Sequence, residues 1–431
     1  MNPTNQNPTN QINSPSFFGL GIAPSILELI SKMRLKTPTP IQFKAIPIAI
    51  EGKDIIGVAQ TGTGKTLSFG IPMIQRLAQG RWRGLVLVPT RELALQVDDV
   101  IRKIANPLGM RTAVLIGGAS MHMQIQALRK NPRVIIATPG RMIDHLRQRT
   151  VRLDDVSILV LDEADRMLDM GFAPQIEQIM GHVPRERQTM LFSATIPERI
   201  VKIAAHHMKL PVSVEIARSG TTVEKVIQEL FIIKKEEKAG LLIKILEQYR
   251  GSVLLFSRTK RGAARIARGL KNEGFSAAEI HSDRSLNQRQ EALEGFKRGK
   301  YRILVATDIA ARGIDVKGIE LVINYDLPDD SENYVHRIGR TARAGHEGRA
   351  ISFATPDQRR DVKDIERLIR SSLPVIKPAG FHSAGFEGAP SGGSRPPQGY
   401  RGQRSRGPGG GGGRPGGSRG ISRSNRGRRY T

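Results

Sequence analysis

The stretch Ala59-Gln60-Thr61-Gly62-Thr63-Gly64-Lys65-Thr66 decides the fold of this chain. The apolar run of residues 54–58 before it predicts a buried strand, and residues 67–74 after it predict the beginning of a helix. Such a turn is an anion site, because its glycines let backbone N–H groups point at phosphate oxygens and the helix dipole adds partial positive charge. Lys65 would reach the β- and γ-phosphates, and Thr66 would hold Mg²⁺. The stretch therefore predicts a site for a nucleoside triphosphate.

Length and composition exclude several classes of protein. The 431 residues suggest two or three domains, and a hydrophobic fraction of 39% is enough for real cores. The absence of cysteine excludes a disulfide framework and a thiolate metal site, and the nine scattered histidines form no spaced ligand set, so we expect no structural metal. The N-terminus lacks the features of a signal peptide, and no apolar run approaches the roughly 20 residues that span a bilayer. We expect a soluble, cytoplasmic protein, or a nuclear one in a eukaryote.

The net charge of +27 implies a polyanionic partner, either nucleic acid or an acidic membrane surface. A charge of this size exceeds what solubility alone requires, and nucleic acid is the preferred interpretation. Residues 391–431 carry ten of these charges as arginines, with no acidic residue and with tyrosines at 400 and 430. The Gly-, Ser- and Pro-rich segment 378–431 is predicted to be a disordered basic tail that tracks nucleic-acid backbones. The alternative is a solubilising linker.

Short Val-, Ile- and Leu-rich runs alternate with amphipathic stretches and predict an α/β fold class with parallel sheets covered on both faces. The predicted strands fall into two groups, Ile55–Ala59, Leu85–Pro89, Val134–Thr138, Ile158–Asp162 and Met190–Ser193, then Val253–Ser257, Ala277–His281, Ile303–Thr307, Leu321–Tyr325 and Ala350–Ala354. We therefore predict a disordered segment at residues 1–15, a first α/β domain at 16–210, a linker at 211–228 and a second α/β domain at 229–377.

The sequence Asp162-Glu163-Ala164-Asp165 follows directly after the apolar residues 158–161. Ligands of open parallel sheets bind at the carboxyl ends of the strands, so these carboxylates would face the same crevice as Lys65. Asp162 would hold Mg²⁺ through its water shell, and Glu163 would orient or deprotonate the attacking water. The alternative for such a short string is a solvated turn.

An ordered set of motifs extends over residues 17–373. It comprises, in chain order, residues 59–66, 89–94 (PTRELA), 117–118 (GG), 138–141 (TPGR), 162–165 (DEAD), 193–195 (SAT), 255–259 (LFSRT), 306–315 (ATDIAARGID) and 336–343 (HRIGRTAR). This set closely resembles the DEAD-box family of ATP-dependent RNA helicases, in the style of its bacterial RhlE-type branch. The resemblance implies two tandem RecA-like domains joined by a flexible linker, with ATP and RNA bound across the cleft between them.

The resemblance also implies residues of the ATP site. Gln42, in the Q motif of residues 38–42, would read the adenine edge and select ATP. Phe17 would support the base, although core packing is the alternative for this aromatic. Asp315 would contact the ribose, and Arg340 and Arg343 would be arginine fingers delivered to the γ-phosphate from the second domain.

Two further groups of residues follow from the resemblance. The first group would contact phosphates and 2′-hydroxyls of the RNA backbone, so little sequence preference is expected. It comprises Thr90, Arg91, Gly118, Thr138 and Arg141 in the first domain, and Arg258 and Thr307 in the second. The residues that couple hydrolysis to strand separation comprise Asp165, Ser193, Thr195, Arg312 and His336, and a capped strand end is the alternative for Ser193 and Thr195.

The chain departs from the family pattern at three places. Arg34-Leu35 replaces the usual Gly–aromatic pair, so adenine stacking on Leu35 should be weaker. Leu286 stands where a Gln is common, and Ala342 where Gly is commoner.

Three functions remain open from the sequence alone. The first is an RNA-dependent ATPase that separates short RNA duplexes, and the second is an ATP-gated RNA clamp or chaperone that never separates strands. The third is a DNA translocase. We expect ATP and Mg²⁺ as cofactors, RNA as partner, and a monomer, within a ribonucleoprotein assembly in some settings.

Overall fold

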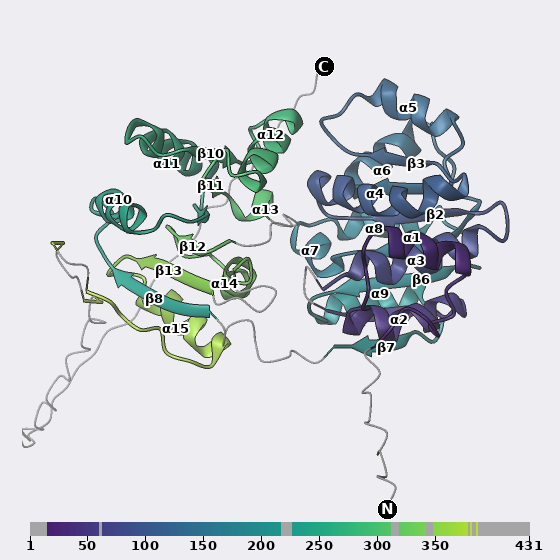
Figure 1. Cartoon of the computed structure of the whole chain (residues 1–431), viewed down its shortest axis with the longest axis horizontal. Helices are drawn as coiled ribbons and strands as arrows, with labels where there is room; N and C mark the ends of the chain where they lie inside the picture. The colour runs from purple at the N-terminus through teal and green to yellow at the C-terminus, as the bar shows by residue number, and fades with distance from the viewer. Residues whose placement is uncertain are drawn as a thin grey trace, which may run out of the picture. The chain divides into compact units, whose positions relative to one another are not determined.

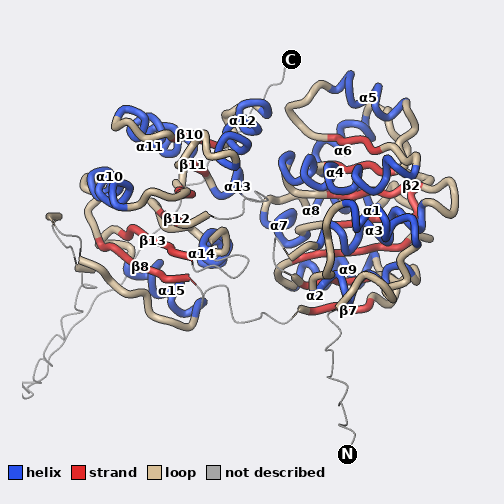
Figure 2. The backbone as a smooth tube through the Cα atoms, viewed as in Figure 1, coloured by secondary structure: helices blue, strands red, loops and turns tan. Residues whose placement is uncertain are grey.

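The computed structural model describes residues 15–59, 63–216, 226–311, 319–341, 348–377, 380–381 and 385–386. Within them the chain forms two parallel β-sheets, each flanked by helices (Figures 1 and 2). The predicted α/β fold class with two parallel-sheet domains is confirmed. The segment 1–14 and residues 387–431 lie outside the described part, so the predicted disorder of these segments stays a prediction.

The elements of the first sheet domain are α1 (Pro24–Lys32), α2 (Pro40–Ile50), β1 (Ile55–Val58), α3 (Lys65–Leu77), β2 (Arg83–Leu87), α4 (Arg91–Ala105), β3 (Thr112–Leu115), α5 (Met121–Arg129), β4 (Val134–Ala137), α6 (Pro139–Arg147), β5 (Val156–Leu161), α7 (Ala164–Asp169), α8 (Ala173–Met180), β6 (Gln188–Ser193), α9 (Glu198–His207) and β7 (Val212–Glu215), with a short 3₁₀ helix at Asn106–Leu108. The strand order in this sheet is β3-β4-β2-β5-β6-β1-β7, and every neighbouring pair is parallel.

The elements of the second sheet domain are β8 (Val226–Ile232), α10 (Lys238–Gln248), β9 (Val253–Phe256), α11 (Lys260–Asn272), β10 (Ala277–Ile280), α12 (Leu286–Lys297), β11 (Ile303–Ala306), α13 (Asp308–Ala311), β12 (Leu321–Asn324), α14 (Ser331–Ile338), β13 (Gly348–Ala354) and α15 (Arg359–Ile369). The order here is β10-β11-β9-β12-β13-β8, again with parallel pairs throughout.

Strand alternation builds two hydrophobic layers on each sheet, because successive side chains of a strand point to opposite faces. In β2, Val86 packs with the core formed by α1–α4, whereas Leu85 and Leu87 pack with the core formed by α6–α9. In β9, Leu254 joins the core under α12, α14 and α15, and Leu255 joins the core under α10 and α11. Both faces of each sheet are therefore buried, which is why the strands read as continuous apolar runs.

The structure corrects the predicted linker. Residues 211–228 contain β7, which pairs with β1 in the first sheet, and the beginning of β8, which pairs with β13 in the second. Both are edge strands whose outer residues are exposed or interrupted by polar side chains, so the apolar pattern that identifies central strands is weak in them. The edge strand β3 was missed for the same reason.

The predicted tail also begins later than residue 378. Phe381 packs against the core under α10 and α11, where Lys244 Nζ lies 5.8 Å from the centre of its ring. Phe386 packs against the other core of the second domain. These two aromatics therefore pack against the second domain from beyond the point where the composition changes. The composition did not reveal them, because two residues hardly alter the average composition of a long segment.

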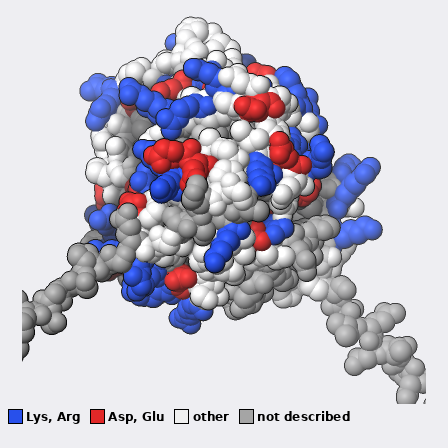
Figure 3. Space-filling view, turned by 90° about the vertical axis from the view of Figure 1, so that its left-hand side faces the viewer, with Lys and Arg blue, Asp and Glu red and all other residues white. Residues whose placement is uncertain are grey.

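No helix in the described ranges is long and apolar enough to cross a bilayer. Figure 3 shows one face of the molecule, on which Lys and Arg side chains are interspersed with Asp and Glu.

We predict that Gly57→Ala destabilises the first domain. A Cβ at Gly57 would lie 2.5 Å from two ring carbons of Phe192, which is fully buried and cannot yield. Overpacking of this kind costs about 1–3 kcal/mol. The matched control is Gly70→Ala within α3, where the nearest atom to the added Cβ is 3.7 Å away. Thermal unfolding should show a lower midpoint for Gly57→Ala only; equal midpoints for the two variants would contradict the prediction.

Candidate functional site

The phosphate loop joins β1 to α3 at the carboxyl edge of the first sheet. Gly64 caps α3 with a φ of 91°, a conformation that favours glycine, and Lys65 follows as the first helical residue. The buried Lys65 Nζ donates a hydrogen bond of 3.0 Å to the carbonyl of Ala59. Thr63 and the half-buried Thr66 flank this turn, whereas Gln60, Thr61 and Gly62 lie outside the described residues. Lys65 is thus turned back over its own loop.

Gln42 ties the Q motif to this loop. Its Oε1 accepts from the Thr39 backbone N–H at 2.9 Å, and its Nε2 donates to the carbonyl of Gly64 at 3.0 Å. A Cβ at Gly64 would collide with that amide nitrogen, so the loop and the Q motif fit each other only with glycine at this position. The structure therefore brings Gln42 beside the predicted phosphate site.

The two predicted base-supporting residues differ in their surroundings. Phe17 is buried in the core formed by α1–α4, in line with the packing alternative for this residue. Leu35 is half-buried and packs against the edge of the same core. Base support by either residue stays a prediction.

Asp162 and Glu163 are buried at the end of β5, and their carboxyl groups respond differently to burial. Burial raises the pKa of Asp162 to about 6; the Lys65 ammonium opposes this rise and Glu163 adds to it. Burial would also raise the pKa of Glu163, but the cations of Arg166 and Lys65 outweigh it and lower that pKa to about 2. Arg166 Nη1 donates to Glu163 Oε2 at 2.6 Å. Glu163 is therefore ionised at neutral pH and held by a neighbour that the sequence reasoning missed.

Asp165 binds the end of the neighbouring strand β6. One oxygen, Oδ2, accepts from the backbone N–H groups of Ala194 and Thr195 at 3.0 Å each, and from the Thr195 hydroxyl at 3.1 Å. The Asp165 N–H donates to Ser193 Oγ at 3.3 Å. Residues Asp162–Asp165, the carboxylate box, and the Ser193–Thr195 segment are thus one hydrogen-bonded unit.

Two of the predicted RNA-binding residues of the first domain, Arg91 and Arg141, contact the turn at Gly118. Arg91 packs against Gly118, where φ is 75° and a Cβ would strike the guanidinium. Arg141 Nη1 donates to the carbonyl of Ala119 at 3.1 Å, and the backbone N–H of Thr138 donates to the carbonyl of Leu115 at 3.0 Å. Thr90 caps α4 by accepting from the Leu93 N–H at 3.2 Å.

Two buried residues that were not predicted hold this turn. Gln124 Nε2 donates to the carbonyl of Ile116 at 3.0 Å, and its Oε1 accepts from the Ile116 N–H at 3.2 Å. His145 Nε2 lies 3.3 Å from Gln124 Oε1, and its Nδ1 lies 2.7 Å from Thr150 Oγ1. The sequence shows only that each is a polar residue on an otherwise apolar helix face. This pattern does not reveal which group the side chain bonds to.

In the second domain, Arg337 organises the end of the sheet. It is buried, makes two bonds of 2.6 Å to the Asp308 carboxylate, and stacks on Phe256 with its guanidinium 4.9 Å from the ring centre. His336 and the buried Arg340 flank it along the chain. His336 and Arg340 thus lie in and just after the last turn of α14, which Arg337 anchors.

The remaining candidates of the second domain are only partly described. Arg258 Nη2 donates to the carbonyl of Leu327 at 3.3 Å, and its Nε lies 3.1 Å from Asp329 Oδ1. Thr307 is half-buried at the end of β11. The predicted residues Arg312, Asp315 and Arg343, together with the unusual Ala342, lie outside the described residues.

Two protein families match this chain, one in each of the two sheet domains. The DEAD/DEAH box helicase family matches residues 39–203, and the helicase conserved C-terminal domain matches residues 237–345. A relative named DEAD-box ATP-dependent RNA helicase CshA, from Geobacillus kaustophilus, is 43% identical over 84% of this chain and 78% of its own length. This relative does not bear on the predicted RhlE-type branch, which stays a prediction.

Two solved structures of similar fold contain bound RNA. The structure of S. cerevisiae Dbp5 bound to RNA and ADP BeF3 matches with a TM-score of 0.73 at 29% identity, covering 84% of this chain and 95% of that one. The structure of Mss116p bound to ssRNA and AMP-PNP matches with a TM-score of 0.76 at 30% identity, covering 83% of this chain and 78% of that one.

We predict that His145 makes the first domain less stable in acid. Burial lowers the pKa of His145, and Arg141 adds to this effect, so the unfolded chain takes up the proton first. The stability that this histidine contributes is complete above its unfolded pKa of about 6.5 and is lost as the pH falls below that value. His145→Gln should therefore lose less stability than the wild type when thermal unfolding is compared at pH 8 and pH 5.5. The exposed His122→Gln serves as control, and equal losses in all three proteins would contradict the assignment.

Proposed function

The chain belongs to the DEAD-box family of ATP-dependent RNA helicases, and on this premise we propose how its own residues couple ATP hydrolysis to local remodelling of RNA. The observation that carries the proposal is the bonding of Asp165 to the Ser193–Thr195 segment. Asp165 lies three residues after Asp162, so any movement of the carboxylate box on hydrolysis is passed directly to β6.

Lys65 and Thr66 would bind the phosphates and the metal. The ammonium of Lys65 is held by the Ala59 carbonyl, a neutral acceptor that an anionic phosphate oxygen would replace. The available donors are the Asp162 carboxylate and the Thr66 hydroxyl, which suit a hard cation such as Mg²⁺. Such an ion, when bound, neutralises charge on the phosphates. Gln42 would read adenine from its place beside Gly64.

Glu163 is suited to act on the attacking water because it is ionised at neutral pH. Its bond to Arg166 fixes the carboxylate, which would orient the water. Arg340 and Arg343 would supply positive charge to the developing transition state, a contribution on the order of 10³–10⁵ in rate for arginine fingers. Asp315 would hold the ribose, and Arg312 and His336 would join the coupling network.

The RNA contacts would lie at the Gly118 turn of the first domain and at Arg258 and Thr307 of the second. Backbone N–H groups, threonine hydroxyls and guanidinium groups bind phosphates and 2′-hydroxyls, which carry no base identity. Little sequence preference follows. ATP and RNA together would favour a closed arrangement that bends one strand, and hydrolysis would release it.

We further propose a cytoplasmic monomer that works with short or single-stranded RNA, alone or within ribonucleoprotein assemblies. The competing function is an ATP-gated clamp that retains RNA without separating strands. In this proposal the first folded domain extends to residue 216 and the second begins at residue 226, because β7 and β8 belong to their sheets.

The two functions differ in their effect on a short RNA duplex. We predict that the wild type separates a labelled ten-base-pair RNA duplex in the presence of ATP and Mg²⁺. Glu163→Gln should bind ATP and RNA and remain in the closed state, because the water is no longer activated, so hydrolysis and repeated cycles of duplex separation are lost. Retention of RNA by the wild type without separation would favour the clamp, and full hydrolysis by Glu163→Gln would remove Glu163 from the reaction.

We also predict that deletion of residues 391–431 weakens RNA binding and flattens its dependence on salt. The segment carries ten arginines, and each phosphate contact contributes about 0.7 to the slope of log K against log salt for a single strand. Titrations of an oligouridylate at several salt concentrations measure that slope, and ATP turnover by the truncated chain should survive. An unchanged slope would show that the segment does not bind RNA.

A further inference from the structure

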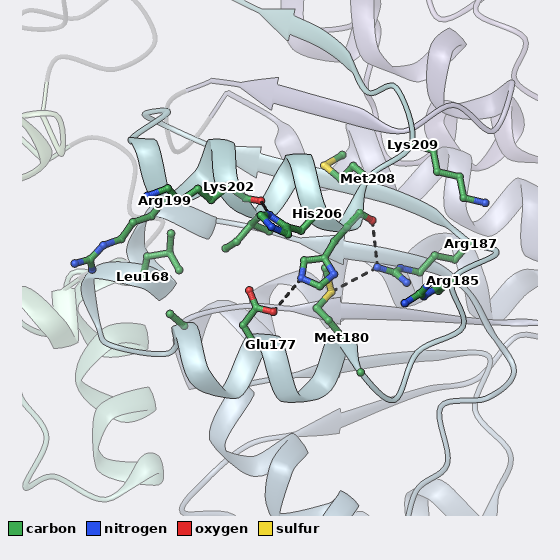
Figure 4. Close-up of a pocket in the computed structure, with 14 residues that line it drawn as sticks. Leu168, Glu177, Met180, Arg185, Arg187, Arg199, Lys202, His206, Met208 and Lys209 are labelled. Atoms are coloured by element: carbon green, nitrogen blue, oxygen red, sulfur yellow. Dashed lines mark hydrogen bonds and ion pairs between the residues drawn. The ribbon is translucent and has the colours of Figure 1, made fainter.

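A groove of about 850 Å³ runs between α8 and α9 on the first domain (Figure 4). None of the residues predicted to bind ATP or RNA is among the described residues that line it. The groove begins near Leu168 and Arg199 and extends to Arg185 and Lys209, which precede β6 and β7. Its far end therefore lies at the amino edge of the sheet, opposite the edge that carries Lys65 and Asp162. The groove therefore shares no described lining residue with the proposed catalytic site.

The rim of the groove is strongly basic. Five cationic side chains line it and only one carboxylate does; the cations are Arg185, Arg187, Arg199, Lys202 and Lys209. The carboxylate, Glu177, accepts from His207 Nε2 at 3.0 Å. Outside the lining, Glu198 pairs with Lys202 and Glu186 pairs with Lys209.

The exposed guanidinium groups of Arg185 and Arg199 have no carboxylate partner within the part of the chain that the structure describes. Positive charge without an internal partner is therefore available at both ends of the groove. A negatively charged ligand is the complement that such a rim fits.

The floor of the groove is apolar. Leu168, Met180, Ile203 and Met208 form it, and all four are buried members of the core under α6–α9. The parts of these side chains that reach the surface line the space between α8 and α9. Methionine and arginine are both enriched at protein interfaces, and the flexible thioether adapts to different side chains.

One wall of the groove is fixed by Arg187. Its Nη1 donates to the carbonyl of Pro184 at 2.7 Å, its Nε donates to Thr189 Oγ1 at 3.1 Å, and its Nη2 reaches the carbonyl of His207 at 3.3 Å. These bonds join the segment before β6 to the end of α9 (Figure 4). The groove is thus preformed, so a ligand would not have to order it.

We propose that this groove binds an acidic, amphipathic helical segment of a partner protein. Aliphatic side chains of that segment fill the floor, and its Asp or Glu side chains meet the cationic rim. A helix of about ten residues spans roughly 15 Å, the length of α9, and lies along the two helices as a third.

An RNA strand fits the same surface less well. The lining residues include no Phe, Tyr or Trp on which bases would stack, and the apolar floor offers nothing to a phosphate backbone. The combination of an apolar floor and a basic rim is what distinguishes a peptide ligand from a nucleic acid.

The test selects peptides from a random 14-residue display library on the full-length chain. The selected peptides are then titrated against Arg199→Glu/Lys202→Glu on α9. The matched control is Arg268→Glu/Lys271→Glu on α11, where an exposed Arg and Lys have the same spacing. An oligouridylate is titrated in parallel.

The proposal expects peptides rich in Asp and Glu with aliphatic residues at helical spacing. The α9 variant should weaken their binding at least about tenfold, because two attractions become repulsions, whereas the α11 variant should leave it unchanged. RNA affinity should be the same in both variants. The proposal is overturned if no peptide depends on the α9 pair, if the selected peptides are neutral or basic, or if the α9 variant alone loses oligouridylate binding.

Discussion

The part of the candidate site in the first domain depends on one constraint. Three parallel strands, β5, β6 and β1, lie side by side in the sheet. These strands are neighbours in the sheet and end at one edge, so Lys65, Asp162 and the Ser193–Thr195 segment meet although about 130 residues of chain separate the first from the last. Asp165 then bonds the end of β5 to the end of β6. A shift of either strand would break three hydrogen bonds to a buried carboxylate, which makes the unit respond as a whole.

Buried charged side chains gather at this carboxyl edge of the first sheet. Lys65, Asp162, Glu163 and Arg166 are all nearly inaccessible to water; the Lys65 ammonium favours the ionised form of both carboxyl groups, and Arg166 favours that of Glu163. The two carboxyl groups have pKa values displaced in opposite directions, because the Arg166 guanidinium bonds to Glu163 and lowers its pKa, whereas burial dominates for Asp162. A bound nucleotide would enter a site whose charges are already oriented, and no reorganisation of water is needed there. In the second domain Arg337 and Asp308 provide a comparable fixed pair.

The sequence was sufficient for the fold class and for the position of Lys65 and Asp162 at the ends of central strands. It was insufficient where a motif does not reveal the hydrogen-bond partner of a buried polar side chain. Gln124 and His145 hold the Gly118 turn from a helix interior, and Arg166 looked like an ordinary charged residue of a helix. The edge strands β7 and β8 were missed because polar residues interrupt both, so neither shows the continuous apolar run of a central strand. Phe17 was ambiguous, and its burial agrees with the packing alternative.

The central claim is that ATP hydrolysis by this chain is gated by RNA through a site built on two sheet edges. The most direct measurement is the rate of ATP hydrolysis by the full-length protein with no nucleic acid, with single-stranded RNA, and with DNA of the same sequence. The account predicts a low basal rate that rises strongly with RNA and little with DNA, because contacts to 2′-hydroxyls are lost. Equal stimulation by DNA, or no stimulation by either, would contradict it.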